Sequence, residues 1–401
     1  MTGCLHGLKV LDISRFIAGP TCAMHLGDLG ADVVKVERKA GEETRANLPQ
    51  LGDQSLYFLT LNRNKRDITL DFRNPADQET LRRLIAKADV LIENFRAGTM
   101  EKMGCGWETL HALNPRLIMV RISGFGQDGP LSARPCFDAI AQAMGGVMSL
   151  TGQSDGPPTL AGVYVADFAT ALFATVGTLA ALNKRHETGE GQLVEATLLE
   201  SVISMLMTAI PQQAQLGTSM GRMGNTDRYV APVNCFQASD GSWVYVQGGT
   251  DALFPRLAET LEMPELLEDP RFSTVYLRLD NADVLEGIVA AWVKERTAET
   301  VVELMDKAGV PCAKVATMAD IIANPQLRAR GQLVEIDHPS AGKYLTNGVP
   351  VRLSDTPASI RRPPPLLDEH RAEILREWLK EESQLAVRGE HCQTKRAGSG
   401  G

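Results

Sequence analysis

The first third of the chain alternates short hydrophobic runs with stretches whose hydrophobic positions recur at helical spacing. Strands are predicted at residues 8–13, 31–37, 67–70, 89–93 and 117–122, and helices at 19–29, 74–88 and 107–113. Strands that alternate with helices at this spacing are typical of a parallel sheet covered by helices on both faces. The opening of the chain therefore predicts the α/β class.

Beyond Pro130 the pattern becomes mostly helical. Helices are predicted at residues 137–148, 168–186 and 198–213, followed by a polar, glycine-rich linker at 217–232. A strand at 243–247 and helices at 252–261, 282–295 and 298–308 predict a smaller α+β domain. A proline-rich connector at 361–365 precedes a last helix at 369–381, and residues 386–401 have the composition of a disordered tail.

Composition narrows the class of protein. Of the 401 residues, 44% are hydrophobic and 22% are charged, which argues against disorder, a coiled coil and a disulfide scaffold. The chain has 41 lysines and arginines against 49 aspartates and glutamates, and this net charge of −8 counts against nucleic acid as a partner. Seven scattered cysteines without a CxxC pair, and a start without a signal peptide, predict a reduced, cytoplasmic protein.

Residues 161–183 form the least charged long stretch, and Asp167 is its only residue charged at neutral pH. The run after Asp167 is shorter than a membrane span requires, so we expect a buried core helix with an acid near its start. Burial disfavours an ionised carboxyl group, whereas a helix N-terminus stabilises it. Two interpretations stay open: an N-cap carboxylate, and a carboxylate nucleophile in a water-poor site.

The glycine-rich segment at residues 124–129 formally matches GxGxxG after a strand. Pro130 and the polar residues 131–134 follow where a dinucleotide fingerprint opens a helix, which counts against a nicotinamide nucleotide. A ligand-binding loop at the carboxyl end of a strand remains the better interpretation. The sequence has no HExxH, no GxSxG and no Cys/His cluster, so neither a metal site nor a nucleophile elbow is predicted.

Basic residues occur at loop-like positions near the predicted strand ends. They form either a solvated face or, as a set, a grip for a polyphosphate ligand, because arginine gives forked contacts and lysine a point charge. Phe95 lies between two of them, where an aromatic ring can pack on a purine. The residues are Arg38, Lys39, Lys65, Arg66, Arg73, Arg96, Lys102 and Arg134.

Short motifs follow one another along nearly the whole chain. They include LKVLD at 8–12, AGP at 18–20, LGADVVKVE at 29–37, NKR at 64–66, ENFR at 93–96, GFG at 124–126, QAMGG at 142–146, TGEGQ at 188–192, DPRF at 269–272 and GVPC at 309–312. Each motif is weak alone, but their order and spacing are specific. Together they resemble the class III coenzyme A transferases, the family of formyl-CoA transferase and carnitine CoA-transferase.

The resemblance implies a Rossmann-like large domain with a parallel sheet, made from residues 1–215 and a return segment at 326–385. It also implies a smaller α+β domain at 216–325 and a homodimer whose subunits interlock as rings. The implied activity moves coenzyme A (CoA) from an acyl-CoA donor to a small carboxylic acid, of the oxalate or succinate dicarboxylic type. The intermediates are an aspartyl-CoA thioester and mixed anhydrides. CoA is a substrate, and no tightly bound cofactor, metal, nucleic acid or membrane is implied.

The resemblance also implies the roles of individual residues. Asp167 falls on the catalytic aspartate of the family. The CoA-binding positions include Ile17 and Ala18, which fall beside the thioester. The other binding positions are Arg38, Leu70, Asp71, Phe72, Arg73, Asn94, Phe95, Arg96, Lys102, Met103, Arg134, Pro135, Cys136, Phe137 and Asp138.

Departures from the family pattern bear on the substrate. Ile17 stands where formyl-CoA transferase has glutamine, Lys102 where it has arginine, and residues 225–232 lack its long glycine-rich loop. These departures count against formyl-CoA and oxalate as the specific pair. An α-methylacyl-CoA racemase-like enzyme is an alternative, but it needs a histidine where Phe137 and Asp138 stand. A CoA-ester-binding protein without turnover is the other alternative.

Overall fold

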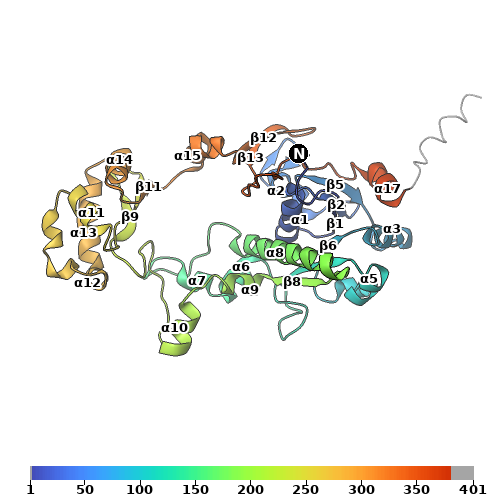
Figure 1. Ribbon diagram of the computed structural model, residues 1–401, viewed down its shortest axis with the longest axis horizontal. Coiled ribbons are helices and arrows are strands. Elements are labelled where there is room, and N and C mark those ends of the chain that lie inside the picture. Colours follow the sequence, from blue (N-terminus) through green and yellow to red (C-terminus); the bar gives the residue numbers. More distant parts are fainter. Residues whose placement is uncertain (1, 381–401) are drawn as a thin grey trace, which may run out of the picture. The chain divides into compact units, whose positions relative to one another are not determined.

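The computed structural model describes residues 2–380, and the chain divides into two compact units (Figure 1). Of the described residues, unit 1 comprises residues 2–146, 162–207 and 326–380, and unit 2 comprises Val147–Ala161 and Thr208–Pro325. Residues 147–161 and 208–215, expected in the large domain, therefore belong to unit 2. The predicted tail at 386–401 lies outside the described residues.

A six-stranded parallel sheet forms the centre of unit 1, with the strand order β5-β2-β1-β6-β7-β8. In the middle of the sheet, Leu11 pairs with Val34 on one side and with Leu91 on the other. The order reverses at β1, and such a switch point opens a crevice at the carboxyl ends of the strands. The strands are β1 (Lys9–Asp12), β2 (Asp32–Glu37), β5 (Lys65–Thr69), β6 (Val90–Glu93), β7 (Ile118–Ser123) and β8 (Leu193–Thr197).

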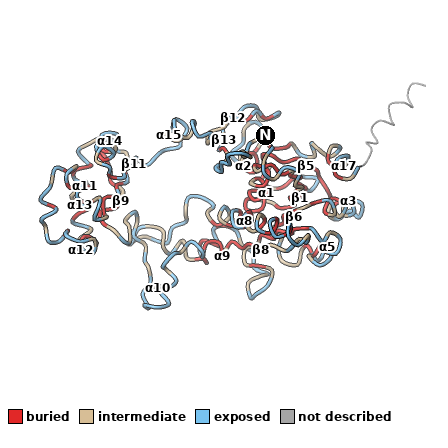
Figure 2. The backbone as a smooth tube through the Cα atoms, viewed as in Figure 1, coloured by how far each residue is buried: buried red, intermediate tan, exposed pale blue. Residues whose placement is uncertain are grey.

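Helices cover both faces of this sheet, as the alternating pattern predicts. One face packs against α3 (Pro75–Ile85), α5 (Trp107–Leu113) and α17 (Arg371–Leu379) through a cluster that includes Leu84, Leu110 and Trp378. The other face is covered by α1 (Ala18–Asp28) and α8 (Val165–Thr188), which contact each other and the strands. Figure 2 shows buried residues gathered along these strands and α1.

Five of the six strands were predicted to within a few residues, and β8 was not. It follows a glycine-rich turn and keeps Glu195 exposed, so neither a hydrophobic run nor a clean alternation marks it. Residues 137–148 and 198–213 were each expected to form one helix, and both predictions are wrong. The helices α6 (Asp138–Met144) and α9 (Leu198–Ile203) belong to unit 1, whereas α7 (Val147–Leu150) and α10 (Ala209–Leu216) belong to unit 2.

The helix α8 is, within residues 2–380, the one helix long and apolar enough to cross a membrane by length and composition. Its small side chains, such as Ala171, Ala174 and Thr178, are buried inside unit 1. Four of its large apolar side chains remain exposed: Phe168, Leu172, Phe173 and Val176. The expected core helix is therefore buried on one face only.

The described part of the return segment, residues 326–380, belongs to unit 1. It contains all of α16 (Pro325–Ala329) except Pro325, and an unpredicted antiparallel hairpin of β12 (Leu333–His338) and β13 (Gly342–Asn347). The Arg361 guanidinium donates to the backbone oxygens of Gly27, Gly30 and Ala31 at the end of α1. The remaining short elements of unit 1 are a 3₁₀ helix η1 (Glu43–Ala46), β3 (Gln50–Leu51), β4 (Gln54–Ser55), α2 (Leu56–Leu61) and α4 (Thr99–Lys102).

Unit 2 combines a small sheet with several helices. Its antiparallel sheet has the order β11-β10-β9 and packs against helices through a core that includes Val246, Leu257 and Val293. The strands are β9 (Val233–Gln237), β10 (Trp243–Gln247) and β11 (Cys312–Lys314). Its other helices are α11 (Phe254–Thr260), α12 (Val275–Asp280), α13 (Ala282–Lys294), α14 (Ala298–Ala308) and α15 (Met318–Ala323).

Candidate active site

A cavity of about 540 Å³ lies in unit 1 where β1, β6 and β7 end. Its walls come from the loops that follow these strands, at residues 15–18, 94–97 and 122–124, and from residues 132–139. Asp167, at the start of α8, also lines the cavity. The sheet's switch point therefore forms a pocket at the edge where ligands bind in open α/β sheets.

Asp167 lies in the first turn of α8, three residues after the N-cap residue Tyr164. The cap is instead supplied by Asp138 from α6, because its Oδ1 accepts from the backbone N–H of Ala166 at 2.8 Å and of Asp167 at 3.1 Å. The N-cap interpretation of Asp167 is therefore wrong. The Asp167 side chain is left to face the cavity, and Asp138 satisfies the helix end.

The environment of Asp167 raises its pKa to about 7. Burial is the main cause, and the neighbouring negative charge of Asp138 adds to it, while a hydrogen bond from the backbone N–H of Ala18 lowers the pKa. A carboxyl group with this pKa is a better nucleophile than an ordinary aspartate and still ionises near neutral pH.

Apolar and aromatic side chains surround the acid. The rings of Phe16 and Phe137 meet edge to face at 5.6 Å, and those of Tyr57 and Tyr164 at 6.4 Å. A second, apolar cavity of about 290 Å³ shares Ile17, Tyr57 and Tyr164 with the first. Such walls make the surroundings of the carboxylate apolar and leave room for a carbon chain.

Arginines give the cavity a basic side. Arg15 and Arg38 both pair with Glu43 Oε1, each at 3.2 Å. Arg96 and Arg134 line the same cavity. The guanidinium groups are suited to phosphate or carboxylate ligands, since they form forked hydrogen bonds.

The structure places many of the predicted residues together and others apart. With Asp167, the cavity is lined by Ile17, Ala18, Asn94, Phe95, Arg96, Arg134, Pro135, Cys136, Phe137 and Asp138. Arg38 reaches the cavity wall only through Glu43, and Leu70 is fully buried in the core. The other predicted positions outside the lining are Asp71, Phe72, Arg73, Lys102 and Met103.

Two residues in the lining use their polar atoms within the protein. The Asn94 amide accepts from the backbone N–H of Arg15 at 2.9 Å and donates to its carbonyl at 2.6 Å. Asp138 is 5% exposed and is bonded to the start of α8. Their hydrogen bonds indicate that Asn94 and Asp138 position the backbone around the cavity.

Lys65 and Arg66 do not belong to a polyphosphate grip, contrary to one interpretation of the basic set. Lys65 is fully buried and paired with Asp12 at 2.8 Å, and Arg66 is paired with Asp32 at 2.6 Å. Lys65 and Arg66 are the first two residues of β5, and both charges are paired with carboxylates inside unit 1.

Several cavity residues carried no sequence signal of function. Arg15, Glu43 and Tyr57 come from different loops and helices, and only the fold brings them to Asp167. Across residues 2–380, no group of three or more His, Cys, Asp or Glu side chains is placed to hold a metal ion.

This architecture and site agree with what comparison with known proteins shows. The family model of CoA-transferase family III matches residues 5–371. The solved structure of a CAIB/BAIF family protein from Brucella suis is 37% identical and superimposes with a TM-score of 0.85, covering 94% of this chain and all of that one. The chain therefore belongs to CoA-transferase family III.

Curated relatives have specific activities in their names. Succinyl-CoA:mesaconate CoA-transferase of Haloarcula hispanica is 41% identical over 385 residues, covering 94% of this chain and 96% of the relative. Succinyl-CoA--D-citramalate CoA-transferase of Chloroflexus aurantiacus is 38% identical over 377 residues, covering 94% of each. The chain is thus an enzyme of the class III CoA-transferases, which move CoA from a CoA thioester to a carboxylic acid.

Proposed function

We propose that Asp167 is the nucleophile of this transferase and that the acceptor is a small dicarboxylic acid. The observation that carries the proposal is a partly buried carboxyl group in the first turn of α8, facing the cavity and with its pKa raised to about 7. The backbone N–H of Ala18 lowers the pKa of this carboxyl group, and the same N–H is proposed to stabilise the oxyanion that develops beside it.

The reaction needs two exchanges that mirror each other. The Asp167 carboxylate attacks the thioester carbonyl of the donor, the C–S bond breaks, and an acyl-aspartyl anhydride and CoA thiolate form. The thiolate attacks the aspartyl carbonyl, which releases the donor acid and leaves an aspartyl-CoA thioester. The acceptor carboxylate then attacks this thioester, and the released thiolate takes the acceptor's acyl group from the second anhydride. Asp167 returns as a carboxylate, and no proton is gained or lost.

CoA has to be held while its sulfur is exchanged. Arg96 and Arg134 lie on the cavity wall that contains Asp167, and both are suited to phosphate groups. Phe95 lies beside Arg96 and offers a ring for the adenine. Arg38, Arg73 and Lys102, which lie outside the cavity lining, are proposed to extend this grip along the CoA tail.

The apolar second cavity supports an acid with a carbon chain. Its walls, which include Ile17 and Phe168, suit the methylene groups of a four- or five-carbon acid better than the polar oxalate. Succinyl-CoA is the donor in the names of both relatives above. We therefore favour succinyl-CoA as donor and a dicarboxylic acid of the succinate type as acceptor, in the cytoplasm.

A homodimer is part of the proposal. On α8, Phe168, Leu172, Phe173 and Val176 are between 40% and 62% exposed, and they recur at the spacing of one helix face. A contiguous exposed apolar face is typical of a protein interface. The interlocked-ring arrangement of the family would bury such a face.

Replacing the nucleophile tests the proposal. Asp167→Ala is expected to lower CoA exchange at least about 10⁴-fold, because the covalent route is lost. Exchange between succinyl-CoA and a panel of acids is measured, and hydroxylamine traps the aspartyl thioester in the wild type only. Asp155→Ala, at an exposed aspartate of unit 2, is the control and keeps wild-type activity.

Other results would identify the alternatives. A fully active Asp167→Ala enzyme would rule out Asp167 as the nucleophile. Tight binding of CoA esters without exchange would support a binding protein without turnover. Exchange of the α-proton with the thioester intact would support racemase chemistry.

A further inference from the structure

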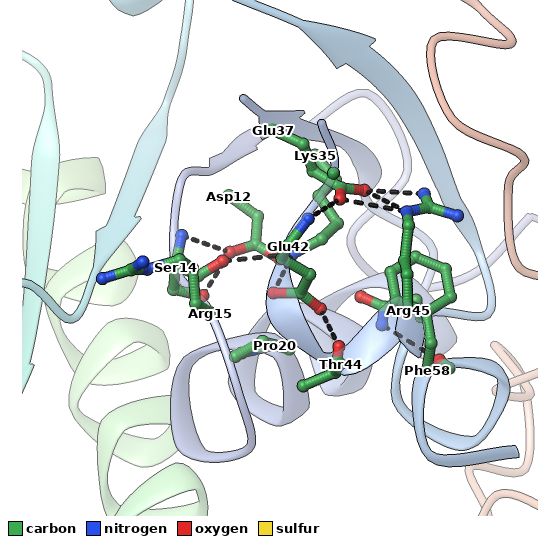
Figure 3. A network of polar contacts seen from close by, with 12 residues as sticks. Asp12, Ser14, Arg15, Pro20, Lys35, Glu37, Glu42, Thr44, Arg45 and Phe58 are labelled. Carbon is green, nitrogen blue, oxygen red and sulfur yellow. Dashed lines mark hydrogen bonds and ion pairs between the residues drawn. The ribbon is translucent and has the colours of Figure 1, made fainter. Parts of the chain in front are cut away.

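A network of buried charges is bonded to the segment between Ser14 and Pro20 (Figure 3). Asp12, Lys35 and Lys65 are each 0% exposed, and none of them lines the cavity. Buried ions carry a desolvation cost that apolar side chains of similar volume avoid, so stability alone is a weak reason for such a network. Its contacts show a more specific role.

Each lysine holds one backbone carbonyl of the segment between β1 and the first turn of α1. Lys35 Nζ donates to the carbonyl oxygen of Ser14 at 3.0 Å, and its charge is balanced by Glu42 Oε2 at 3.3 Å. Lys65 Nζ donates to the carbonyl oxygen of Pro20 at 2.8 Å. The two ammonium groups therefore fix the main chain on both sides of Ala18.

Asp12 connects Lys65 to Ser14, near the start of the segment. Its Oδ2 accepts from Lys65 Nζ at 2.8 Å, and its Oδ1 accepts from the backbone N–H of Ser14 at 3.0 Å and from the Ser14 hydroxyl. A Cβ atom on Gly19 would lie 2.3 Å from Ser14 Cβ, so the segment folds tightly back on the first turn of α1. Phe16, between them, has a φ of 67°, which a non-glycine residue adopts only when its surroundings impose it.

A residue that follows β6 also binds the segment. The Asn94 amide, directly after β6, forms both hydrogen bonds with the Arg15 backbone. Side chains that begin on or follow β2, β5 and β6 thus converge on one short piece of main chain. Ala18 belongs to this piece and lines the cavity together with Asp167, and its backbone N–H lowers the pKa of that carboxyl group.

We propose that Lys35 and Lys65 are positioning residues of the transfer reaction, because they hold the Ser14 and Pro20 carbonyls so that the Ala18 N–H points at the Asp167 carboxylate. This inference rests on Asp167 being the nucleophile. The lysines touch no substrate. They act on the reaction by positioning the Ala18 N–H. This N–H orients the attacking carboxylate and stabilises the charge that develops beside it.

The test replaces each lysine by a neutral side chain of similar length. Lys35→Met and Lys65→Met are expected to lower kcat about 10–100-fold, because a donor displaced by about 1 Å loses much of its effect. The KM for the acyl-CoA is expected to change by less than about threefold, since the CoA-contacting side chains are elsewhere.

A second readout separates positioning from stability. The titration of the Asp167 carboxyl group, followed by ¹³C NMR in the resting full-length protein, is expected to move to higher pH in both variants, because the Ala18 N–H favours the carboxylate. The other ionisable groups that face Asp167, which are Asp138, Tyr57 and Cys136, are unchanged in these variants.

Arg63→Met is the matched control. Arg63 is also a buried cation with a carboxylate partner, Asp28 at 2.7 Å, and it also holds a backbone carbonyl, that of Asn347. Its partner Asp28 is the last residue of α1, at the end of the helix opposite Ala18. This variant is expected to lose stability while it keeps the kcat of the folded enzyme and the Asp167 titration.

Ser14→Ala serves if the lysine variants do not fold, since it removes only the hydroxyl bond to Asp12. It is expected to lower kcat about fivefold. If the wild type transfers CoA and these variants keep both kcat and the Asp167 titration, as Arg63→Met does, the positioning role is refuted. If the wild type shows no exchange, the proposed function fails, and the NMR titration alone decides whether the lysines place the donor.

Discussion

At the scale of single residues, two carboxyl groups share the entrance of α8 and have different tasks. Asp138 caps the helix and is bonded to the backbone of Ala166 and Asp167. Its negative charge also helps to raise the pKa of Asp167, which burial raises further. One acid therefore places the other and tunes its ionisation.

Asp138→Asn separates these two effects. The amide oxygen keeps the cap, while loss of the charge lowers the pKa of Asp167 below about 7. Because the carboxylate is the active form, the acidic limb of the pH profile of kcat/KM is expected to move to lower pH. Asp138→Ala also loses the cap and is expected to cost about 1 kcal/mol of unfolding free energy. An acidic limb that stays in place in Asp138→Asn would show that the charge of Asp138 does not tune Asp167.

The residues of the site differ in how far the sequence reveals them. Asp167 could be singled out because it is an isolated acid in an apolar stretch. Arg15 and Tyr57 could not, since they lie far from Asp167 in the chain and have no periodic signal. Lys65 gave a misleading signal, because a lysine beside an arginine indicates a solvated or ligand-binding position. Its burial is explained by the ion pair with the buried Asp12, which the sequence does not reveal.

At the scale of elements, α8 has two different faces. Its buried face is built from small residues that let it lie close to α1 and the sheet, and its exposed face carries Leu172 and Val176. The hydropathy of the helix predicts that both of its faces are buried. Within unit 1, only one face of the helix is covered. The second face is where a partner chain is proposed to bind.

Leu172→Glu combined with Val176→Glu tests this surface. Charges placed in a buried apolar interface are expected to weaken dimerisation by about 3 kcal/mol or more, which is at least about 100-fold. Sedimentation velocity measures the change, and Lys184→Ala, at the polar end of the same helix, is the control with unchanged mass. A wild-type protein that is monomeric at all concentrations would contradict the proposed dimer.

Helices and strands were predicted correctly where the hydrophobic pattern is strong. The prediction failed where a glycine ends a helix or where a strand forms only because a neighbouring strand pairs with it. The strands β1, β2, β6 and β7 follow from buried apolar runs. The break after α6 depends on Gly145 and Gly146, the second with a φ of 86°. The hairpin of β12 and β13 alternates charged and apolar residues too irregularly to be recognised.

At the scale of the whole molecule, Asp67 ties the sheet to the return segment. Its Oδ1 accepts from the backbone N–H of Asp368 at 2.7 Å. Burial and the neighbouring Glu37 carboxylate raise the pKa of Asp67, while Arg45 and Lys35 hold the pKa of Glu37 below its usual range despite burial. The pair therefore keeps one proton, on Asp67, at neutral pH.

This shared proton predicts how stability depends on pH. The folded state binds one proton more than the unfolded chain above about pH 4, so its contribution to stability declines as the pH rises toward the raised pKa. Asp67→Asn mimics the protonated acid and is expected to flatten the fall of Tm between about pH 5 and pH 9. Scanning calorimetry across this range checks it, with Asp128→Asn, at an exposed loop, as the control. Equal slopes in both variants would contradict the shared proton.

The arrangement of the whole chain lies beyond sequence pattern alone. Alternating strands and helices predict the parallel sheet, but not that residues after 325 return to it. The contacts that bring them back, such as Arg361 on the end of α1, join residues more than 300 positions apart. Resemblance to a family implied the return, and physical reasoning explains it only once the structure is known.

The return of α17 has a consequence for synthesis on the ribosome. Ile374 and Trp378 complete the core that contains Leu11 and Leu91, so the sheet of unit 1 stays open until nearly the whole chain has emerged. Most of unit 2 is one continuous stretch, Thr208–Pro325, which leaves the exit tunnel before them. The middle of the polypeptide is thus able to fold while its first residues still await their packing partners, which reverses the usual N-to-C order.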